Sequence, residues 1–316
     1  MNVFVIDTFP DSFVQALASR DLTLTYRPAA DRAEVLSLIG GQEVLILNSK
    51  VRVDRDLIDA APALRLVIRA GVGMDHIDEA YLAEKGIAAC NTQGANADAV
   101  GEQTVGMLLA LRQHLRRADA QVRQFQWQRE ANRGLELGGR TVGLVGYGHT
   151  GRAVARKLSG FRCRVLAYDK YLTGYGELFA NQATMDDLFQ HADILSLHIP
   201  LTDETRELVN AEFLGRFKRP IMLLNLARGP IVHLPALLDA LDSGQVTAAA
   251  LDVLPNEKLH QLSDTERALY QRLFAHERVL LSPHIGGWTH ESRENINQRI
   301  LALVDEHLQA RTEQPG

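Results

Sequence analysis

A glycine-rich stretch constrains the fold of this chain more than any other feature of the sequence. It reads Thr141-Val-Gly-Leu-Val-Gly-Tyr-Gly-His-Thr-Gly151 and begins as an apolar run typical of a buried strand. Its second half carries three glycines at the spacing G-x-G-x-x-G: Gly146, Gly148 and Gly151. The first glycine permits a tight turn, the second lets the backbone approach a pyrophosphate, and the third lets a helix pack closely on the strand. The pattern therefore predicts a strand, a phosphate-binding turn and a helix.

The residues after these glycines extend the pattern to a dinucleotide-binding unit. Apolar residues at helical spacing follow over 152–158, and a second strand-like run, 164–168, ends at Asp169. A carboxylate at this place, 18 residues beyond Gly151, accepts hydrogen bonds from the ribose hydroxyls of NAD but repels the 2′-phosphate of NADP. We therefore predict a Rossmann domain that prefers NAD, although the nearby cations Lys170 and Arg152 would weaken that preference.

Length and composition indicate a globular protein of two domains. The chain has 316 residues, which is more than one average hydrophobic core holds. Of these residues 46% are hydrophobic and 23% are charged, an ordinary composition for a globular protein. Its net charge of −5 gives no reason to expect nucleic acid or an anionic membrane as a partner. No apolar run approaches the roughly 18–20 residues that span a bilayer. We therefore expect a protein that binds neither nucleic acid nor membrane.

Two further observations predict a cytoplasmic location. The N-terminus, Met1–Asp7, has no basic start and resembles a first strand more than a signal peptide. The two cysteines, Cys90 and Cys163, lie in strand-like apolar runs, so we expect buried free thiols in a reducing compartment.

Strand-like runs alternate with helical patterns in both halves of the chain, which predicts parallel sheets covered by helices on both faces. The strands expected in the first hundred residues are Val3–Ile6, Val44–Leu47, Leu66–Arg69 and Ile87–Cys90. The helices expected there are Asp11–Ser19, Arg32–Ile39 and Asp54–Ala60. From Thr141 onward the expected strands are Val142–Val145, Arg164–Tyr168, Ile194–His198, Ile221–Leu226, Ala248–Leu251 and Val279–Ser282.

These patterns lead to an α/β fold of two doubly wound parallel-sheet domains with a cleft between them. The NAD-binding Rossmann domain is expected over 96–285, and a flavodoxin-like substrate or catalytic domain over 1–95 and 286–316. The second domain is discontinuous because the helical pattern His290–Leu308 has no sheet of its own. Residues Ala95–Leu115 predict one long helix, and the polar stretch Arg116–Glu136 an arm or an interface segment.

Three charged residues stand where expected strands end, which is where doubly wound sheets place their chemistry. Arg228, Glu257 and His284 follow the fourth, fifth and sixth strands of the second half. Histidine suits proton transfer because its unperturbed pKa is ~6.5, and a nearby carboxylate orients the ring and favours its protonated form. A guanidinium can hold a substrate carboxylate and polarise its carbonyl. Each residue alone is more often an ordinary loop residue, but together, behind a dinucleotide fingerprint, they predict hydride exchange with a 2-hydroxy acid.

At this point the sequence resembles the D-isomer-specific 2-hydroxyacid dehydrogenases over nearly its whole length. The stretches that carry the resemblance, in order, are Ala70–Asp78, Asn91–Glu102, Gly146–Gly151, His198–Thr202, Asn225–Gly229, Asp252–Val253 with Glu257, and Ser282–Gly287. The resemblance implies NAD-dependent interconversion of a D-2-hydroxy acid and its 2-keto acid. It also implies that Arg228, Glu257 and His284 match the family's catalytic Arg, Glu and His.

The resemblance assigns further positions, none of them to a metal. The backbone at Val72 and Gly73 matches the turn that binds the substrate carboxylate, and Asn96 matches a polar position nearby. The matching cofactor positions are Gly146, Gly148, His149, Thr150, Gly151, Asp169, His198, Pro200, Thr205, Ala227, Asp252, Thr104, Gly286 and Gly287. The family is usually dimeric through its nucleotide domains, which implies a homodimer with the segment 116–136 in the interface.

The substrate is left open by the sequence. The stretches Val67–Gly73 and Trp127–Arg129 resemble the phosphoglycerate dehydrogenase branch, here without the C-terminal regulatory domain that some members carry. In that case a substrate phosphate would meet Arg69 and Arg129, with Lys50 or Arg52 as further candidates. The equally weighted alternative is that Arg69 packs at a strand end and the other cations face water. The candidate substrates are 3-phosphoglycerate with 3-phosphohydroxypyruvate, hydroxypyruvate, glyoxylate and pyruvate. An alternative of another class is an NAD(H)-binding sensor or corepressor on the same fold, with little turnover.

The sequence departs from the family pattern at two places. Lys258 follows Glu257 where the family often has proline, and an insertion-like stretch, Leu259–His276, comes next. The loop that carries Glu257 is therefore expected to be looser. His233 stands where a helix start usually has an acidic residue, and we expect it to cap that helix poorly.

Overall fold

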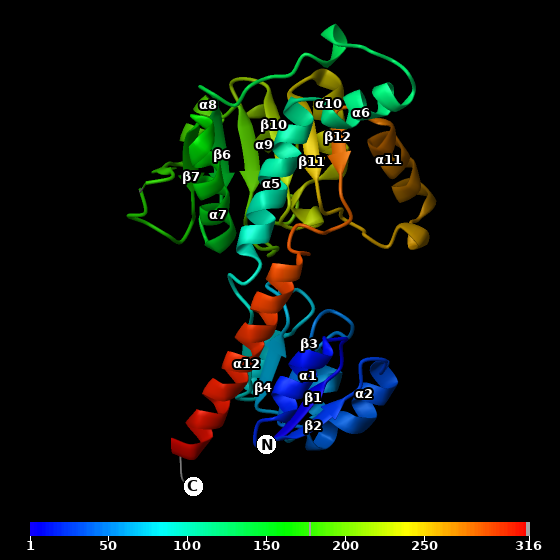
Figure 1. Cartoon of the computed structure of the whole chain (residues 1–316), viewed down its shortest axis with the longest axis vertical. Helices are drawn as coiled ribbons and strands as arrows, with labels where there is room; N and C mark the ends of the chain where they lie inside the picture. The colour runs from blue at the N-terminus through cyan, green and yellow to red at the C-terminus, as the bar shows by residue number, and fades with distance from the viewer. Residues whose placement is uncertain (177, 314–316) are drawn as a thin grey trace. The chain divides into compact units, whose positions relative to one another are not determined.

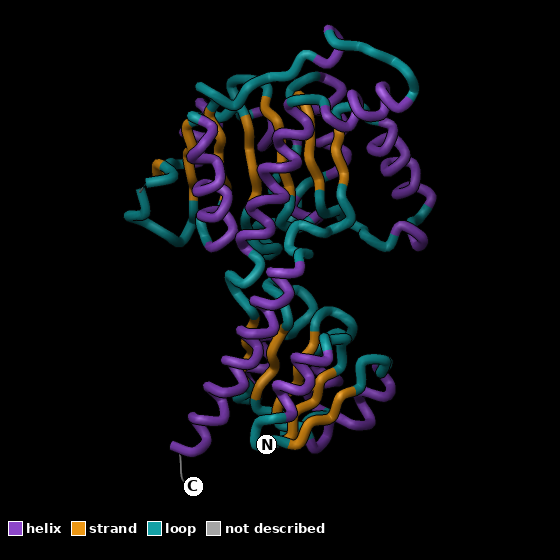
Figure 2. Tube along the Cα trace, viewed as in Figure 1, coloured by secondary structure: helices purple, strands orange, loops and turns teal. Residues whose placement is uncertain are grey.

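A computed structural model describes residues 1–176 and 178–313 of the chain. Two compact units are formed (Figure 1): the first unit is Met1–Asn96 with Thr289–Gly316, and the second unit is Ala97–Trp288. The last three residues of the substrate domain expected from the sequence, 314–316, lie outside the described residues. Figure 2 shows that the strands of each unit run side by side between helices.

The first unit contains a five-stranded parallel sheet in the order β2-β1-β3-β4-β5. This is the flavodoxin-like order of a doubly wound sheet, as predicted. Its strands are β1 (Asn2–Val5), β2 (Thr23–Tyr26), β3 (Val44–Leu47), β4 (Leu66–Arg69) and β5 (Ala88–Asn91). Its helices are α1 (Asp11–Ala18), α2 (Arg32–Leu38), α3 (Arg55–Asp59), α4 (Glu79–Glu84) and α12 (His290–Glu313), with a 3-10 turn, η1 (Ile39–Gly41).

Alternate residues of the central strands of this unit pack on opposite faces of the sheet. In β3, Leu45 and Leu47 pack with residues of α2, α3 and α4, whereas Val44 and Ile46 pack with residues of α1 and α12. All four β3 residues are fully buried, which is the reason that such a strand reads as a continuous apolar run.

The second unit contains a seven-stranded parallel sheet in the order β12-β11-β10-β9-β6-β7-β8. Its strands are β6 (Thr141–Val145), β7 (Arg164–Tyr168), β8 (Asn181–Gln182), β9 (Ile194–Leu197), β10 (Ile221–Asn225), β11 (Val246–Leu251) and β12 (Val279–Leu281). When the strands are numbered from β6, the six strands from β8 across to β11 have the order 3-2-1-4-5-6, which is that of a Rossmann fold. The chain reverses direction across the sheet between β6 and β9, and ligands bind at such a switch point.

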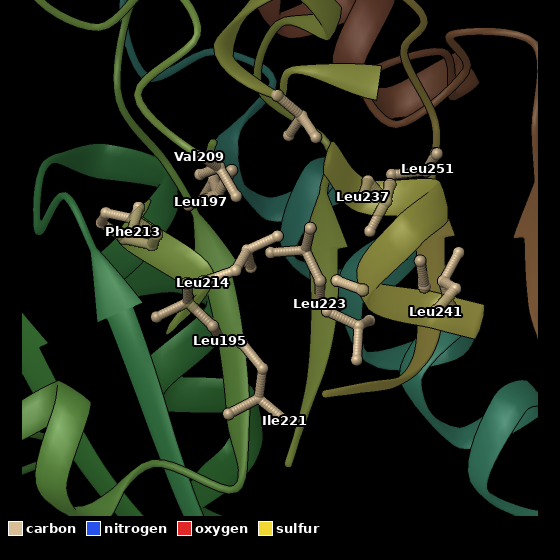
Figure 3. Packing of buried hydrophobic residues seen from close by; sticks show 14 of the residues in the cluster. Leu195, Leu197, Val209, Phe213, Leu214, Ile221, Leu223, Leu237, Leu241 and Leu251 are labelled. Carbon is tan, nitrogen blue, oxygen red and sulfur yellow. The ribbon is translucent and has the colours of Figure 1, made fainter. Parts of the chain in front are cut away.

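Helices cover both faces of the second sheet. One face packs with α5 (Ala97–Arg112) and α7 (His149–Leu158). The other face packs with α8 (Met185–His191), α9 (Ala211–Gly215), α10 (Leu234–Ser243) and α11 (Asp264–Ala275). Figure 3 shows part of this second layer, in which Leu214, Leu237 and Leu241 of the helices lie over Leu195 and Leu223 of the strands. The remaining elements are α6 (Leu115–Arg123) and the 3-10 turns η2 (Glu130–Asn132), η3 (Ser159–Phe161), η4 (Gly229–Ile231) and η5 (Leu259–Gln261).

The single helix predicted over Ala95–Leu115 is wrong at its C-terminal end. Helix α5 ends at Arg112, and His114 has a left-handed backbone (φ 52°) before α6 begins. The buried Arg112 side chain donates hydrogen bonds to the carbonyl oxygens of Leu135 (3.2 Å) and Glu136 (2.5 Å). These bonds tie the end of α5 to the chain that returns from the 116–136 segment, so the break has a tertiary cause that helical periodicity does not reveal.

The structure adds detail to one smaller expectation and corrects two others. The insertion-like stretch contains an ordinary helix, α11, whose N-terminus is closed by a capping box between Ser263 and Glu266. His233 does cap α10, because its Nδ1 accepts a hydrogen bond from the Ala236 N–H at 3.3 Å. Cys90 and Cys163 are free thiols but half-buried, not buried. No described helix is both long and apolar enough to cross a membrane.

Candidate active site

The glycine turn after β6 fits the phosphates of a dinucleotide. Gly146 has a left-handed backbone (φ 97°), and a methyl group there would overlap the carbonyl of His198. A methyl group on Gly151 would likewise overlap the carbonyl oxygen of Gly146. Gly148 precedes α7 and faces open space, and no side chain caps the helix. The N–H groups at the start of α7, which include those of His149 and Thr150, are therefore left to bind an anion.

Asp169 joins this turn to the loop after β7. Its Oδ2 accepts a hydrogen bond from Tyr147 N–H (2.8 Å), and its Oδ1 accepts from the N–H groups of Tyr171 (2.9 Å) and Leu172 (3.0 Å). A carboxylate oxygen has two lone pairs, so Oδ2 keeps acceptor capacity for a ribose hydroxyl. The predicted position of this carboxylate at the end of the second Rossmann strand agrees with the observed one.

The loop after β9 flanks the other side of β6. It is closed on itself, because the Thr205 hydroxyl donates to the Pro200 carbonyl (2.7 Å) and accepts from Thr202 N–H (2.8 Å). Burial lowers the pKa of His198 to about 4, and its Nε2 lies 2.9 Å from the Ser196 hydroxyl. His198 is therefore neutral near pH 7.

His284 and Glu257 form a close pair at the carboxyl ends of β12 and β11. The His284 Nδ1 lies 3.0 Å from Glu257 Oε2, and both side chains are 47% exposed. Burial acts to raise the pKa of Glu257, but the hydrogen bond and charge of His284, the Leu254 N–H and the charge of Arg228 together hold that pKa below its usual value. Glu257 is thus a carboxylate that fixes Nδ1 and leaves Nε2 for another partner.

The buried Asp252 holds the loop that carries His284. Its carboxylate accepts hydrogen bonds from the Ser282 hydroxyl (2.5 Å) and from the N–H groups of Ile285 (3.0 Å) and Gly286 (2.8 Å). The His284 N–H also donates to the Asp252 carbonyl (2.7 Å). These bonds maintain the left-handed backbone of His284 (φ 55°), a conformation that costs free energy outside glycine. They also explain Gly286, because a methyl group there would press on the Asp252 carboxylate.

Arg228 is positioned by a second buried polar side chain, Asn225, at the end of β10. The Asn225 amide donates to the Arg228 carbonyl (2.9 Å) and its oxygen accepts from Ala227 N–H (3.0 Å). At Gly229 a side chain would overlap the backbone of Leu254, so this turn packs directly on the loop that leads to Glu257. Arg228, Glu257 and His284 are therefore brought to one edge of the second sheet.

The first unit holds its own predicted turn in place. The Asn91 amide, at the end of β5, donates to the Val72 carbonyl (2.8 Å) just before Gly73. The Arg69 guanidinium folds back over Gly71 and donates to the Ala70 carbonyl (3.0 Å). Asn96 is the last residue of this part of the unit and is partly exposed.

Comparison with known proteins decides the family. The family model described as D-isomer specific 2-hydroxyacid dehydrogenase, NAD binding domain, matches residues 105–286. The chain is 31% identical over 307 residues to the hydroxypyruvate reductase of Thermotoga maritima, with 97% of this chain and 98% of the relative covered. The chain belongs to the D-isomer specific 2-hydroxyacid dehydrogenases.

Two other comparisons bear on this family membership. The D-3-phosphoglycerate dehydrogenase of Mycobacterium leprae is 34% identical over 304 residues. The match covers 96% of this chain but only 56% of that longer relative. The D-lactate dehydrogenase of Aquifex aeolicus, solved with NAD and lactic acid, superimposes with a TM-score of 0.86 at 26% identity, covering 99% of this chain and 97% of that one. This 2-hydroxyacid dehydrogenase is an NAD-dependent oxidoreductase whose substrate is a small hydroxy or keto acid.

Two residues predicted for the binding sites of this dehydrogenase, Thr104 and Lys50, donate hydrogen bonds to backbone carbonyls of the chain. Thr104 is buried in α5, where its hydroxyl donates to the Val100 carbonyl at 2.7 Å. The Lys50 ammonium donates to the Pro28 carbonyl at 2.7 Å. The sequence analysis included Asn225, Asn91 and Ser282 in the stretches that carry the resemblance but assigned them no role; the structure shows that they orient the loops. Asn225 and Asn91 end strands, and a polar residue at such a strand end is the signal that could have identified them.

Proposed function

We propose that this enzyme interconverts a D-2-hydroxy acid and its 2-keto acid, with His284 as the acid–base group, Glu257 as its orienting carboxylate and Arg228 as the anchor of the substrate carboxylate. The observation that carries the proposal is the 3.0 Å contact between His284 Nδ1 and Glu257. The loop that carries His284 is held by Asp252. Bound NAD(H) accepts or supplies the hydride. The other tasks in the mechanism are assigned to side-chain and backbone groups of the chain itself.

His284 exchanges the proton that accompanies the hydride. With Nδ1 held by Glu257, Nε2 is the nitrogen available to the substrate oxygen. In keto-acid reduction a protonated His284 donates the Nε2 proton to the carbonyl oxygen and ends neutral; in the reverse direction the neutral ring takes that proton back. The ionised Glu257 stabilises the imidazolium form in both directions.

Arg228 is proposed to bind the substrate carboxylate, since a guanidinium can offer two parallel N–H donors to it. In the first unit we propose the same task for the backbone N–H groups of Val72 and Gly73, with Asn96 as a polar neighbour. The Asn91–Val72 bond supports this, because it fixes the direction of that turn. The residues proposed to hold NAD are those of the glycine turn, Asp169, the His198–Thr205 loop, Ala227, Asp252, Gly286 and Gly287, with Thr104 behind them in α5.

For the substrate we propose a small unphosphorylated keto acid, with hydroxypyruvate first and glyoxylate and pyruvate next. The hydroxypyruvate reductase relative is matched over 98% of its length, which supports this order. The internal bonds of Lys50 and Arg69 support it as well, because both cations already bind backbone carbonyls. The alternative, 3-phosphohydroxypyruvate, is favoured by the position of Arg69 beside the Val72 turn.

The deciding experiment measures NADH oxidation by absorbance with 3-phosphohydroxypyruvate, hydroxypyruvate, glyoxylate, pyruvate and a bulky 2-keto acid. We expect the highest kcat/KM for hydroxypyruvate. A preference for the phosphorylated acid, lost in Arg69→Met, would replace our substrate by the alternative. No turnover with any of the five, while NADH still binds, would favour the sensor or corepressor function instead.

We also propose a homodimer formed through the segment 116–136. The support is apolar exposure on an ordered segment: Phe125 is fully exposed and Trp127 is 77% exposed. The segment is braced by a hydrogen bond from Arg117 to Asn132 at 2.9 Å. Sedimentation should therefore give a dimer that Phe125→Asp converts to a monomer, whereas Leu178→Asp, at an apolar side chain elsewhere that is 87% exposed, leaves it intact. A wild-type monomer would contradict the proposal.

The two free thiols support a reducing compartment, and we propose the cytoplasm. Fractionation of cells that express the chain with a C-terminal tag tests this, and recovery outside the cytoplasmic fraction would refute it.

A further inference from the structure

Two cations lie near Asp169, and both have a partner within the chain. The Lys170 ammonium forms an ion pair with Glu204, with a very short contact between Nζ and Oε2. The Arg152 guanidinium lies 5.1 Å from the centre of the Tyr147 ring, and its Nε donates to the Tyr147 carbonyl at 3.2 Å. Both cations therefore already interact with groups of the chain.

The Lys170–Glu204 pair connects two loops that are separated in the sheet. Lys170 follows β7 and Glu204 follows β9, and the sheet order β9-β6-β7 puts the strand that ends in the glycine turn between them. Each partner stands in a braced loop: Asp169 binds the N–H groups of Tyr171 and Leu172, and Thr205 binds Pro200 and Thr202. The pair therefore spans the carboxyl end of β6, where a dinucleotide would lie.

Charge in this region bears on the choice between NAD and NADP. The two dinucleotides differ by a 2′-phosphate, which needs a cation close to the ribose. Asp169 is negative, Lys170 positive and Glu204 negative, so these three residues together carry one negative charge. Without Glu204 their sum would be zero, and the Lys170 ammonium could turn to a phosphate.

We infer that Glu204 is a cofactor-selectivity residue, which rejects NADP by holding Lys170 in an ion pair and by adding its own negative charge beside the ribose site. Without Glu204, the neighbouring Lys170 would compensate the negative charge of Asp169. The ion pair with Glu204 removes that compensation. The inference concerns cofactor binding and is independent of which keto acid the enzyme reduces.

The expected size of the effect follows from exposure. Lys170 is 52% exposed and Glu204 is 66% exposed, so water and salt screen the pair. An exposed pair of this kind is weak, so the hold of Glu204 on Lys170 opposes NADPH binding only modestly. Loss of Glu204 should therefore improve NADPH binding by a factor of about two to ten, and less at high ionic strength.

The test measures dissociation constants of NADH and NADPH by calorimetry, without any keto acid. In Glu204→Gln, the Kd of NADPH should fall about two- to tenfold and that of NADH should stay within about twofold. Asp203→Asn, in the same loop, is the control for loss of one negative charge and should give a smaller change. Glu204→Lys, which reverses the charge, should strengthen NADPH further.

A double variant separates the two parts of the inference. In a Lys170→Met background, Glu204→Gln should lose most of its gain, because no ammonium is left to release. A gain that persists there would refute the role of Lys170, and an unchanged NADPH Kd in both Glu204→Gln and Glu204→Lys would refute the inference altogether. Since no turnover is measured, failure of the proposed catalytic residues would not alter either result.

Discussion

Two regions of the second unit each depend on one carboxylate, but in opposite surroundings. We call them the proposed catalytic edge, with Arg228, Glu257 and His284, and the proposed adenosine edge, with Asp169, Lys170 and Glu204. At the catalytic edge the Asp252 carboxylate is 2% exposed and its bonds fix the His284 loop. At the adenosine edge the Glu204 carboxylate is 66% exposed and holds a single lysine. A buried acceptor is costly to disturb, whereas an exposed one can be exchanged for solvent. The comparison indicates that the loop of the proposed acid–base group is held by buried bonds, whereas the proposed cofactor-selectivity pair is held by an exposed one.

The largest expected effect is at the group that the rigid loop presents. His284→Ala removes the proposed proton donor, so kcat for keto-acid reduction should fall by roughly 10²–10⁴-fold. NADH binding, measured by calorimetry, should persist because the glycine turn is untouched. Near-wild-type kcat in this variant would show that His284 is not the acid–base group. The catalytic edge would then have no demonstrated role in catalysis.

A pair of glycine substitutions separates stability from binding within the cofactor turn. In Gly151→Ala the new methyl group overlaps the Gly146 carbonyl, so the variant should lose about 1–3 kcal/mol of unfolding free energy. In Gly148→Ala the methyl group meets open space, so stability should hold while NADH affinity falls, because the methyl group stands in the path of the phosphates. Urea unfolding and calorimetry measure the two effects. Equal stability losses in both variants would contradict this description of the turn.

The same carboxylate-to-amide change tests the two edges directly. Asp252→Asn replaces an acceptor by a donor that faces other donors, and we expect a loss of about 1–3 kcal/mol in unfolding free energy. Glu204→Gln should stay within about 0.5 kcal/mol, as exposed substitutions do. Both are measured by urea unfolding followed by circular dichroism. Similar values for the two variants would mean that burial does not distinguish the edges.

Much of the fold could be predicted because buried parallel strands have a plain sequence signal. The bounds of β3, β4 and β7 agree with the sequence prediction, since these strands read as short apolar runs. Strand β2 was missed because it lies at a sheet edge and alternates polar with apolar residues, and β8 because it consists of Asn181 and Gln182 alone. The wrong end of the long helix came from bonds to residues more than 20 positions away.

The candidate site was predictable to a similar depth. The rule that chemistry lies beyond strand ends located Arg228, Glu257 and His284, and the structure brings them to one edge. The supporting network was not predictable, because the bond from Gly286 to Asp252 joins residues 34 positions apart. The Lys170–Glu204 pair also spans 34 positions and depends on the sheet order, which no local motif encodes.

The smallest expected effect is on pH dependence and tests whether Glu257 acts through charge. Burial acts to raise the pKa of Glu257, but its interactions with His284, Leu254 and Arg228 hold that pKa below its usual value. The carboxylate is therefore ionised throughout the neutral range, where it favours the protonated imidazole that reduction requires. Glu257→Gln keeps the shape and removes the charge, so the fall of kcat/KM with rising pH should begin at a lower pH.

The direction of that shift distinguishes charge from packing. If Glu257 acts electrostatically, the oxidation reaction, which needs the neutral ring, should shift in the same direction and extend to lower pH. Glu212→Gln, an exposed carboxylate at the start of α9, removes an equal charge elsewhere and should leave both profiles in place. A uniform loss of rate in Glu257→Gln, with both pH profiles unmoved, would assign Glu257 a role in holding the ring and none in its charge. The catalytic edge would then be ordered by geometry alone, and its contrast with the exposed, charge-governed adenosine edge would be sharper.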